Sequence, residues 1–382
     1  MKNIYKILSY VLVAVLSSAL TLFLLAQEPE TSKLQELSNL IEECFIGEAD
    51  RTAYEDAAAD AMVNALGDRW SYYIPADEYQ AHVEQMKNSY VGIGITIVVT
   101  EDGSGFQVTK VNPGAPAEEA GMQPGDVIVG IGGKSCEGMS TEDARNMVRG
   151  ETGTQVLLSV LRNGATMELE VTRKQVLTAV AEAELLEGNT GLITIVNFDE
   201  RCASETIEAI ESMLEQGAEA LVFDVRFNPG GYKEELVDVL DYLLPEGPLF
   251  RSEDYRGRVS VDESDENCLD IPMAVLVNAD SYSAAEFFAA ALSEYEAAVI
   301  VGQQTTGKGY FQSTYQLSDG SAVGLSIGKY TTPKGVSLAD VGITPDVVVE
   351  VDGETALGIY ADTLPAMEDP QILAALEALK AS

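Results

Sequence analysis

The chain has a single histidine, His82, and only four cysteines among its 382 residues. One histidine cannot build a His-rich metal site, and no two cysteines are spaced as CxxC, so the sequence predicts no metal site. Four cysteines are too few for a disulfide scaffold, and their spacing leaves open whether any of them pair. A Ser-His-Asp triad would rest on His82 alone, and no serine or aspartate motif accompanies it.

Basic side chains are also scarce, with 23 Lys and Arg against 62 Asp and Glu, which gives a formal net charge of −39. A charge of this sign repels phosphate backbones and excludes a nucleic-acid-binding protein. Hydrophobic residues make up 46% of the chain, which is the composition of a folded protein, and the length predicts two or three domains.

One long stretch, residues 7–26, contains no charged side chain. As a helix it would span about 30 Å, the thickness of a bilayer core. Lys2 and Lys6 precede it, and positive charge before a span keeps the N-terminus in the cytoplasm. Residues 1–30 are therefore expected to be a single-pass anchor in the cell membrane, with the catalytic portion outside the cytoplasm. A cleaved signal peptide is the alternative, although the apolar run is long for one.

Residues 31–89 are predicted to form an N-terminal helical region. Apolar residues recur at helical spacing from Leu34 to Leu40, and residues 57–66 continue as an alanine-rich helix. A loop at residues 67–75 interrupts the pattern before a short helix at residues 77–86. His82 lies on that helix and is expected to be a packing or surface residue.

Residues 90–177 form short β-runs separated by glycine turns. The pattern predicts strands at 93–98, 106–111 and 127–131, short helices at 116–121 and 140–149, and a hairpin around Asn163-Gly164. This order, with VGIGI at 91–95, PGAPA at 113–117 and GMQPGD at 121–126, resembles a PDZ domain in the circularly permuted form of bacterial proteases. The alternative is a small β-domain with ordinary glycine turns.

A PDZ domain binds the free C-terminus of a protein or peptide. The resemblance implies that the backbone amides of one loop, called the PDZ loop below, hold the terminal carboxylate. The strand beside this loop pairs with the extended peptide. The residues assigned to this loop are Gly92, Ile93, Gly94 and Ile95.

From residue 178 to 352 the pattern alternates strand and helix, which predicts a mainly parallel sheet with covering helices. Beyond Lys308 it becomes antiparallel, with a hairpin around Asp319-Gly320. Residues 353–382 are expected to be a C-terminal helical tail, whose last helix begins near Asp369-Pro370.

Ser283 and Lys308 are the candidate reactive pair. Ser283 follows a buried strand and leads directly into a helix, whose first amides point toward charge that develops there. Lys308 ends the next β-unit and returns to the same edge of the sheet. A lysine acts as a base only when it is neutral, and an apolar pocket of nearby aromatic residues would favour that form. Alternatively, Ser283 caps the helix and Lys308 is a surface residue.

Two competing motifs fail on their context. The Walker-A-like GQQTTGKG at 302–309 has glycine where a magnesium-binding Ser or Thr belongs, and a strand follows instead of a helix. The S-x-x-K match at 326–329 lies in an alternating strand, where residues three apart point to opposite faces.

Residues 32–350 resemble the C-terminal processing peptidases, the tail-specific family of Ser-Lys serine peptidases with a PDZ domain. SYSAAE at 281–286 is similar to the family's S-A-S-A-S-E motif, and TGKGYFQ at 306–312 is similar to F-G-K-G-x-x-Q. DVRFNPGG at 224–231 resembles D-L-R-x-N-P-G-G, and TPKG at 332–335 and GITPD at 342–346 match the closing strands.

The resemblance implies an α/β multidomain fold. A crotonase/ClpP-like protease core carries an inserted permuted PDZ domain, an N-terminal helical region and one transmembrane helix. It also implies a serine endopeptidase that cleaves proteins near or toward their C-termini without a metal or organic cofactor. The helical region is expected to allow a homodimer, and the PDZ domain to gate activity.

The family's reactive residues carry over onto matching positions. Ser283 attacks the scissile carbonyl, Lys308 takes the proton, and Gln312 orients Lys308 by hydrogen bonding. The amides of Gly230 or Gly231, together with that of Ala284, form the oxyanion hole.

Two segments depart from the family pattern. GDRWSYY at 67–73 replaces the usual D-P-H-S region, and Tyr282 and Ala285 replace a small residue and a serine beside Ser283. Neither change removes a reacting group. A catalytically silent PDZ-containing adaptor is the alternative from another functional class, and the intact Ser283, Lys308 and Gln312 argue against it.

Overall fold

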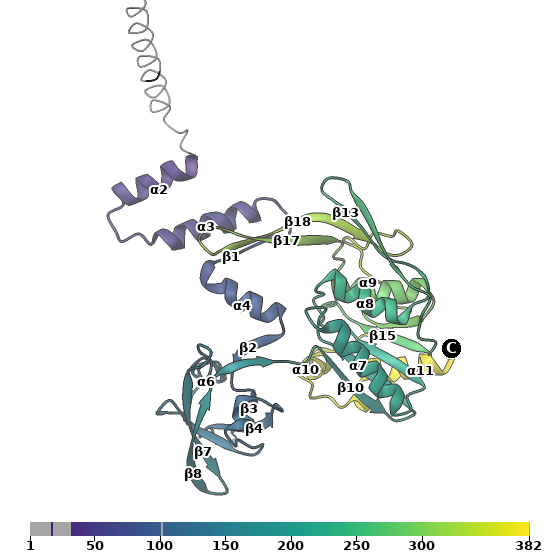
Figure 1. Ribbon diagram of the computed structural model, residues 1–382, viewed down its shortest axis with the longest axis horizontal. Coiled ribbons are helices and arrows are strands. Elements are labelled where there is room, and N and C mark those ends of the chain that lie inside the picture. The colour runs from purple at the N-terminus through teal and green to yellow at the C-terminus, as the bar shows by residue number, and fades with distance from the viewer. Residues whose placement is uncertain (1–16, 18–31, 101, 382) are drawn as a thin grey trace, which may run out of the picture. The chain divides into compact units, whose positions relative to one another are not determined.

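The computed structural model of the protein describes residues 17, 32–100 and 102–381 (Figure 1). Among these residues, no helix is both long and apolar enough to cross a membrane. The expected membrane span at residues 7–26 lies outside the described residues except for Ser17. Contacts divide the chain into two compact units, residues 1–67 and 68–382.

The first unit contains the helices α2 (Lys33–Cys44) and α3 (Arg51–Asn64). Each helix begins at a capping side chain, Ser32 for α2 and Asp50 for α3, which accepts a hydrogen bond from an amide of the first turn. The apolar side chains Leu34, Leu37 and Leu40 of α2 are exposed. The homodimer stays a prediction.

A six-stranded sheet forms the centre of the second unit, in the order β10-β11-β12-β15-β16-β19. Its strands are β10 (Ala181–Leu186), β11 (Thr190–Ile195), β12 (Ala220–Asp224), β15 (Met273–Val277), β16 (Ala298–Gly302) and β19 (Val347–Val348). All neighbours from β11 to β19 run parallel, and only the edge strand β10 is antiparallel. The predicted parallel sheet is therefore confirmed.

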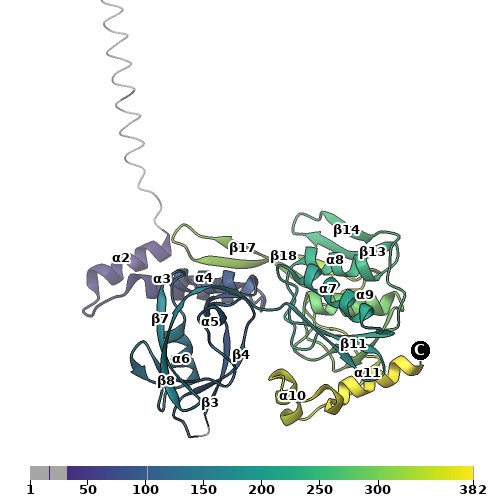
Figure 2. The same cartoon turned by 60° about the horizontal axis from the view of Figure 1, so that its bottom comes forward.

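Helices cover both faces of this sheet. On one face lie α7 (Cys202–Glu215), α8 (Lys233–Leu243) and α9 (Ala284–Glu294). Figure 2 shows α11 (Pro370–Ala381) along the opposite face, after α10 (Gly353–Tyr360) and the 3-10 turn η1 (Ala366–Glu368). Side chains alternate between the two cores: Phe223 of β12 packs toward α9, whereas Val222 packs toward α11.

A buried ion-pair network fastens α11 to the end of β12. Arg226 donates to the carboxylate of Asp224, to Asp369 at 2.7 Å and to Gln371 at 2.9 Å. The guanidinium is paired on both sides, which buried charge requires. The network fixes the start of the loop at residues 227–231, called the glycine loop below.

A second sheet lies on the path β1-β18-β13-β14, with β17 paired to β18. Its strands are β1 (Tyr72–Ile74), β13 (Gly247–Asp254), β14 (Val259–Ser264), β17 (Tyr310–Gln316) and β18 (Ala322–Thr331). The β17–β18 hairpin confirms the prediction. The strands β1, β13 and β14 were not predicted from the sequence. β1 has only three residues and forms because it pairs with β18.

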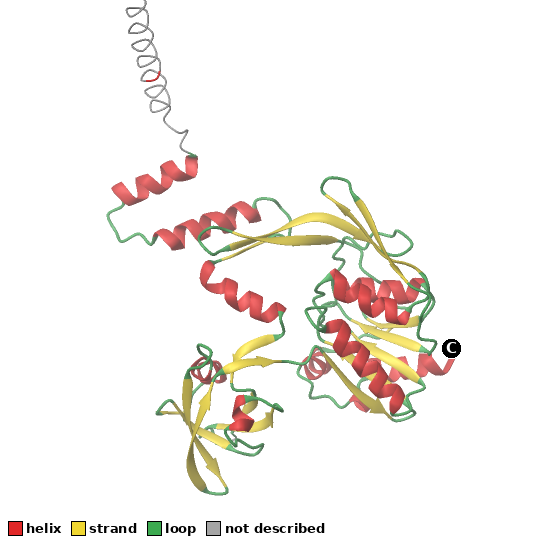
Figure 3. Ribbon diagram, viewed as in Figure 1, coloured by secondary structure: helices red, strands yellow, loops and turns green. Residues whose placement is uncertain are grey.

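The PDZ unit is built mainly of strands, as Figure 3 shows, around the sheet β3-β4-β5-β7-β8 with β6 paired to β5. Its elements are β3 (Ile95–Val99), β4 (Phe106–Val111), α5 (Pro116–Glu119), β5 (Val127–Ile131), β6 (Lys134–Ser135), α6 (Thr141–Val148), β7 (Gln155–Arg162) and β8 (Ala165–Thr172). The expected strand at 93–98 starts later, because residues 93 and 94 form a turn between β2 and β3.

The strands β2 (Ser89–Gly92) and β9 (Lys174–Leu177) form an antiparallel pair at the two ends of the PDZ unit. The helix α4 (Ala76–Met86) leads into β2. Next to the pair, the amides of Asn88 and Asn197 hydrogen bond reciprocally at 2.9 and 2.7 Å. Arg201 donates to the carbonyl of Thr178 at 2.8 Å. The segments that enter and leave the PDZ unit are therefore both hydrogen bonded to the α/β core.

Candidate active site

Ser283 stands at a sharp turn between β15 and α9. Its backbone has φ 59° and ψ −125°, a conformation rare for any residue except glycine, and such strain is found at functional sites. The hydroxyl of Ser281 donates to the carbonyl of Val225 at 2.7 Å, and the amide of Tyr282 donates to the carbonyl of Asn228 at 3.1 Å. These bonds hold the turn against the glycine loop.

The glycine loop contacts Ser283 directly. A Cβ atom at Gly230 would lie 2.6 Å from the Cβ of Ser283, and one at Gly231 would lie 2.3 Å from the carbonyl carbon of Phe198. The amide of Phe198 donates to the carbonyl of Gly230 at 2.8 Å. Only glycine fits at these two positions. Because glycine has no side chain, the backbone of the loop can lie directly against Ser283.

The amides around Ser283 differ in what they bind. That of Gly230 donates to the side-chain oxygen of Asn228 at 2.8 Å. In the described part of the chain, no hydrogen bond uses the amides of Gly231 or Ala284. Of the two glycines considered from the sequence, Gly231 is thus the one whose amide remains free, beside that of Ala284.

The carboxylate of Glu286 joins the serine turn to the loop at residues 303–309 that carries Lys308. It lies in the first turn of α9 and is 0% exposed. It accepts hydrogen bonds from the amides of Ser283 at 3.1 Å, Gly307 at 2.7 Å and Lys308 at 2.8 Å, and from the hydroxyl of Thr305. Burial raises the pKa of Glu286, and these bonds oppose the rise.

Lys308 is largely buried among aromatic rings. Its Nζ lies 5.0 Å from the ring centroid of Trp70 and 5.7 Å from that of Tyr282. No hydrogen bond among the described residues involves this Nζ. Burial lowers the pKa of Lys308 to about 8, although the nearby carboxylates of Asp68 and Glu286 favour the charged form. A substantial fraction of the side chain is therefore neutral near physiological pH.

The rings beside Lys308 come from positions where the sequence departs from the family motifs that it resembles. Trp70 and Tyr282 contact each other, with centroids 5.8 Å apart. The pocket was expected from nearby aromatic residues on α9 and β17. Phe287 and Phe288 on α9 instead fill the core beneath the helix.

Hydrogen bonds fix the position of residues 68–71, called the Trp70 loop below. Asp68 accepts from the amide of Trp70 at 3.1 Å and from the hydroxyl of Ser71 at 2.6 Å, and Ser71 accepts from the amide of Ser326 at 3.1 Å. Gln312 donates to the hydroxyl of Ser326 at 3.0 Å. The loop is therefore fastened to β18 at the residue that Gln312 also contacts.

Gln312 does not hydrogen bond to Lys308 in the described structure. Its amide donates to the hydroxyl of Ser326 and to the carbonyl of Tyr310, at 3.0 and 3.1 Å. The expected direct contact is thus replaced by an indirect one, in which Gln312 supports the strand that holds the Trp70 loop.

The hydroxyl of Ser283 instead meets that of Tyr330, with 2.9 Å between the oxygens. Tyr330 lies on β18, among the rings of Phe287, Phe250 and Phe311 at centroid distances of 4.6, 5.1 and 5.8 Å. Burial raises the pKa of Tyr330 well above its usual value, so the phenol stays protonated.

The residues assigned to the PDZ loop lie together at the start of that unit. Gly92 ends β2, Ile93 and Gly94 form the turn, and Ile95 begins β3. Gly94 has φ 77°, and a Cβ there would lie 2.3 Å from that of Ala115. The position requires glycine both for its conformation and for its close packing.

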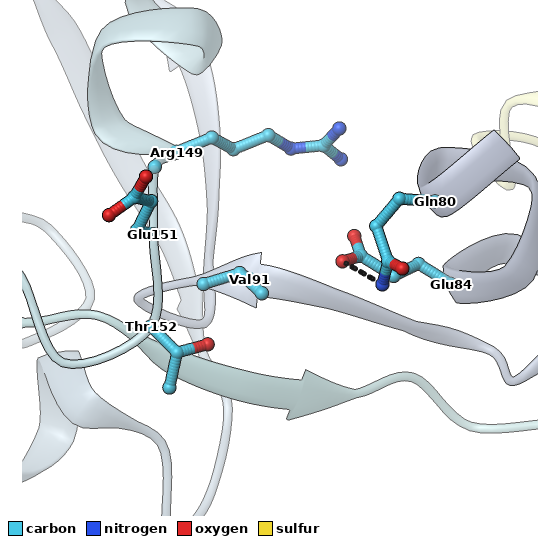
Figure 4. A pocket seen from close by; sticks show the side chains of 7 residues that line it. Gln80, Glu84, Val91, Arg149, Glu151 and Thr152 are labelled. Atoms are coloured by element: carbon cyan, nitrogen blue, oxygen red, sulfur yellow. Dashed lines mark hydrogen bonds between the residues drawn. The ribbon is translucent and has the colours of Figure 1, made fainter. Parts of the chain in front are cut away.

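A pocket of about 390 Å³ lies beside Val91, the residue that precedes this loop (Figure 4). Gln80, Glu84, Val91 and residues 149–152 line it. Arg149 extends toward α4, and no hydrogen bond or ion pair of the described residues engages its guanidinium. The guanidinium carbon lies 5.3 Å from the ring centroid of Tyr90, and none of the described residues pairs it with a carboxylate.

His82 plays the packing part expected of it. Its ring centroid lies 5.9 Å from that of Tyr72, and burial lowers its pKa.

The α/β core carries a strained serine at a helix start and a lysine whose backbone amide binds the same carboxylate, and this arrangement points to a serine peptidase. Residues 189–349 match peptidase family S41, and residues 107–162 match a PDZ domain. The chain is 33% identical over 367 residues to carboxy-terminal processing protease CtpA of Bacillus subtilis, which covers 92% of this chain and 78% of that protein.

Other relatives agree. A probable CtpA-like serine protease of Staphylococcus aureus is 29% identical over 336 residues, which cover 87% of this chain and 67% of the relative. A putative S41 protease from Bacteroides fragilis, 16% identical, has the same fold with a TM-score of 0.57 over 93% of this chain and 99% of that one. The chain therefore belongs to peptidase family S41 and is a serine endopeptidase of the C-terminal processing type.

Three residues that contribute to this site were not predicted from the sequence. Glu286 was quoted only as part of a motif, although Ser283 and Glu286 have the S-x-x-E spacing of a capping box. Trp70 was noted only as a departure. Tyr330 carried no local signal, because its role depends on a strand that is distant in sequence.

Glu286→Gln should lower kcat/KM more than tenfold and should destabilise the protein by about 2–4 kcal/mol, because an amide cannot accept from all four donors and sets its own N–H groups against them. Glu294→Gln is the matched control. Glu294 lies on the same helix and accepts from Thr332 and Lys334. Casein cleavage and urea unfolding measure both effects, and equal activity of the two variants would contradict the role given to Glu286.

Proposed function

We propose that this peptidase cleaves protein substrates near or toward their C-termini, with Ser283 as nucleophile and Lys308 as general base. The main support is the buried Glu286 carboxylate, which accepts hydrogen bonds from the backbone amides of both residues and so sets one loop against the other. The pKa of Lys308 is lowered, and its Nζ makes no hydrogen bond within the described part of the chain, so it is available as a base.

In the proposed reaction, Ser283 Oγ attacks the scissile carbonyl while its proton passes to Lys308 Nζ. The electrons of the carbonyl double bond move to its oxygen, where the free amides of Gly231 and Ala284 meet the charge. The C–N bond then breaks as Lys308 returns the proton to the leaving amine. Water, deprotonated by Lys308, releases the acyl group.

Trp70, Tyr282 and Gln312 act on Lys308 in different ways. The two rings remove water from the ammonium and attract it through their π faces. Gln312 is a positioning residue, since it supports Ser326 and, through it, the loop that carries Trp70.

The PDZ unit is proposed to receive the substrate's C-terminus. The turn at Ile93 and Gly94 offers backbone amides to a carboxylate, and the unpaired Arg149 adds positive charge beside it. The names of the relatives, carboxy-terminal processing proteases, agree with recognition of this end.

Residues 7–26 are proposed to anchor the protein in the cell membrane, with the peptidase outside the cytoplasm. The support is the uncharged run that follows Lys2 and Lys6.

Ser283→Ala and Lys308→Ala should each abolish cleavage of casein, because each removes one partner of the proton transfer. Lys334→Ala, at an exposed lysine, should keep wild-type activity. In the wild type, kcat/KM should fall about tenfold per pH unit below about pH 8, since only the neutral amine accepts a proton. Full activity of either alanine variant, or a flat profile from about pH 6 to 8, would contradict the dyad.

Gly94→Ala should distort the carboxylate turn. The wild type should cleave a peptide with a free C-terminus about tenfold faster than its amidated form, and Gly94→Ala should lose this preference. Gly103→Ala is the control, because φ there is also positive at 68° but a Cβ has nothing within 4 Å. The ratio of kcat/KM for the two peptides is the measurement, and an unchanged ratio in Gly94→Ala argues against this recognition.

The full chain should stay with membranes after alkaline carbonate extraction, whereas the protein lacking residues 1–26 should be released. Protease added to intact cells should degrade the full chain if the catalytic part is outside. Release of the full chain by carbonate, or its protection in intact cells, would contradict the anchor or its orientation.

A further inference from the structure

The partner of Ser283 Oγ is a second hydroxyl, that of Tyr330, at 2.9 Å. Tyr330 is only 6% exposed, and no other hydrogen bond of the described residues ends on its phenol oxygen. The contact therefore decides where two hydroxyl hydrogens lie.

The two possible directions of this bond leave different hydrogens without an acceptor. If Ser283 donated, the hydrogen of Tyr330 would be left unbonded inside the ring cluster, which costs free energy for a buried donor. If Tyr330 donates, its hydrogen is satisfied, and the hydrogen of Ser283 stays free to leave toward a base. Ser283 has lone pairs with which to accept, and the hydrogen that then lacks an acceptor is its own, the one that the proposed reaction passes to Lys308.

We propose that Tyr330 is a further catalytic residue, whose O–H donates to Ser283 Oγ and stabilises the negative charge that develops there. This inference rests on the proposed role of Ser283 as nucleophile. It explains how a lysine, a weak acceptor when much of it is protonated, deprotonates an alcohol: the hydrogen bond lowers the pKa of the alcohol.

Tyr330 neither loses nor gains a proton in the proposed reaction. The Ser283 proton goes to Lys308, an Oγ lone pair forms the bond to the carbonyl carbon, and Tyr330 keeps its own proton throughout. When the acyl-enzyme is hydrolysed, the Oγ–C bond breaks, Lys308 returns the proton, and Tyr330 again faces the departing oxygen.

The surroundings of Tyr330 suit a fixed donor. Three phenylalanine rings restrict its position. Burial, and the charge of nearby Glu286, raise the pKa of the phenol, so it does not become a base in the working pH range.

Tyr330→Phe removes only the hydroxyl and keeps the ring. It should lower kcat by about tenfold to a hundredfold with little change in KM, the loss of one hydrogen bond to a charged group. Tyr295→Phe is the matched control, because Tyr295 lies at the other end of α9 and its hydroxyl donates to the carbonyl of Pro248 at 3.1 Å. Wild-type kcat in Tyr330→Phe, or an equal loss in Tyr295→Phe, overturns the inference.

Thermal unfolding of the full chain tests the donor direction without activity. Ser283→Ala should lower Tm, because it leaves the Tyr330 hydrogen without an acceptor, and Tyr330→Phe added to that variant should raise Tm again. A further fall in the double variant overturns the assignment.

The two proposals fail in different ways. Full activity of Ser283→Ala would overturn the nucleophile and with it this inference. An inactive Ser283→Ala beside a fully active Tyr330→Phe would overturn only the role of Tyr330.

Discussion

A single buried carboxylate, that of Glu286, holds together the two loops on which the chemistry depends. The parallel strands β15 and β16 end side by side. The loops that follow them are separate segments, and several of their amides find no acceptor on the backbone. Glu286 satisfies the amides of Ser283, Gly307 and Lys308 at once. Because a buried charge is stable only when its hydrogen bonds are made, the strained serine turn and the lysine loop are ordered as one unit.

The glycine loop depends on a neighbouring support that also reaches the PDZ strands. Phe198 hydrogen bonds to the backbone of Gly230, and the adjacent Asn197 pairs with Asn88 where β2 begins. Asn197 and Phe198 are consecutive residues just beyond β11, so the backbone beside Ser283 and the attachment of the PDZ unit are linked through one short segment.

Much of the architecture was readable from the sequence. The parallel sheet with covering helices between residues 178 and 352 and the hairpin around Asn163-Gly164 both appear where the patterns predicted them. These elements follow from local spacing and turn chemistry. The missed strands β1, β13 and β14 are short or irregular, and pairing with β18 or with each other, not local preference, makes them strands.

The sequence by itself determined the family, the order of the elements, and the positions of Ser283 and Lys308, because these reside in local motifs and in periodic burial. Only the tertiary structure decided their partners. Trp70 beside Lys308, Tyr330 on Ser283, and Gln312 on Ser326 join segments far apart in the chain. Such contacts depend on how the core packs and on which buried donors and acceptors pair. The spacing of residues along the sequence predicts neither the packing nor the pairing.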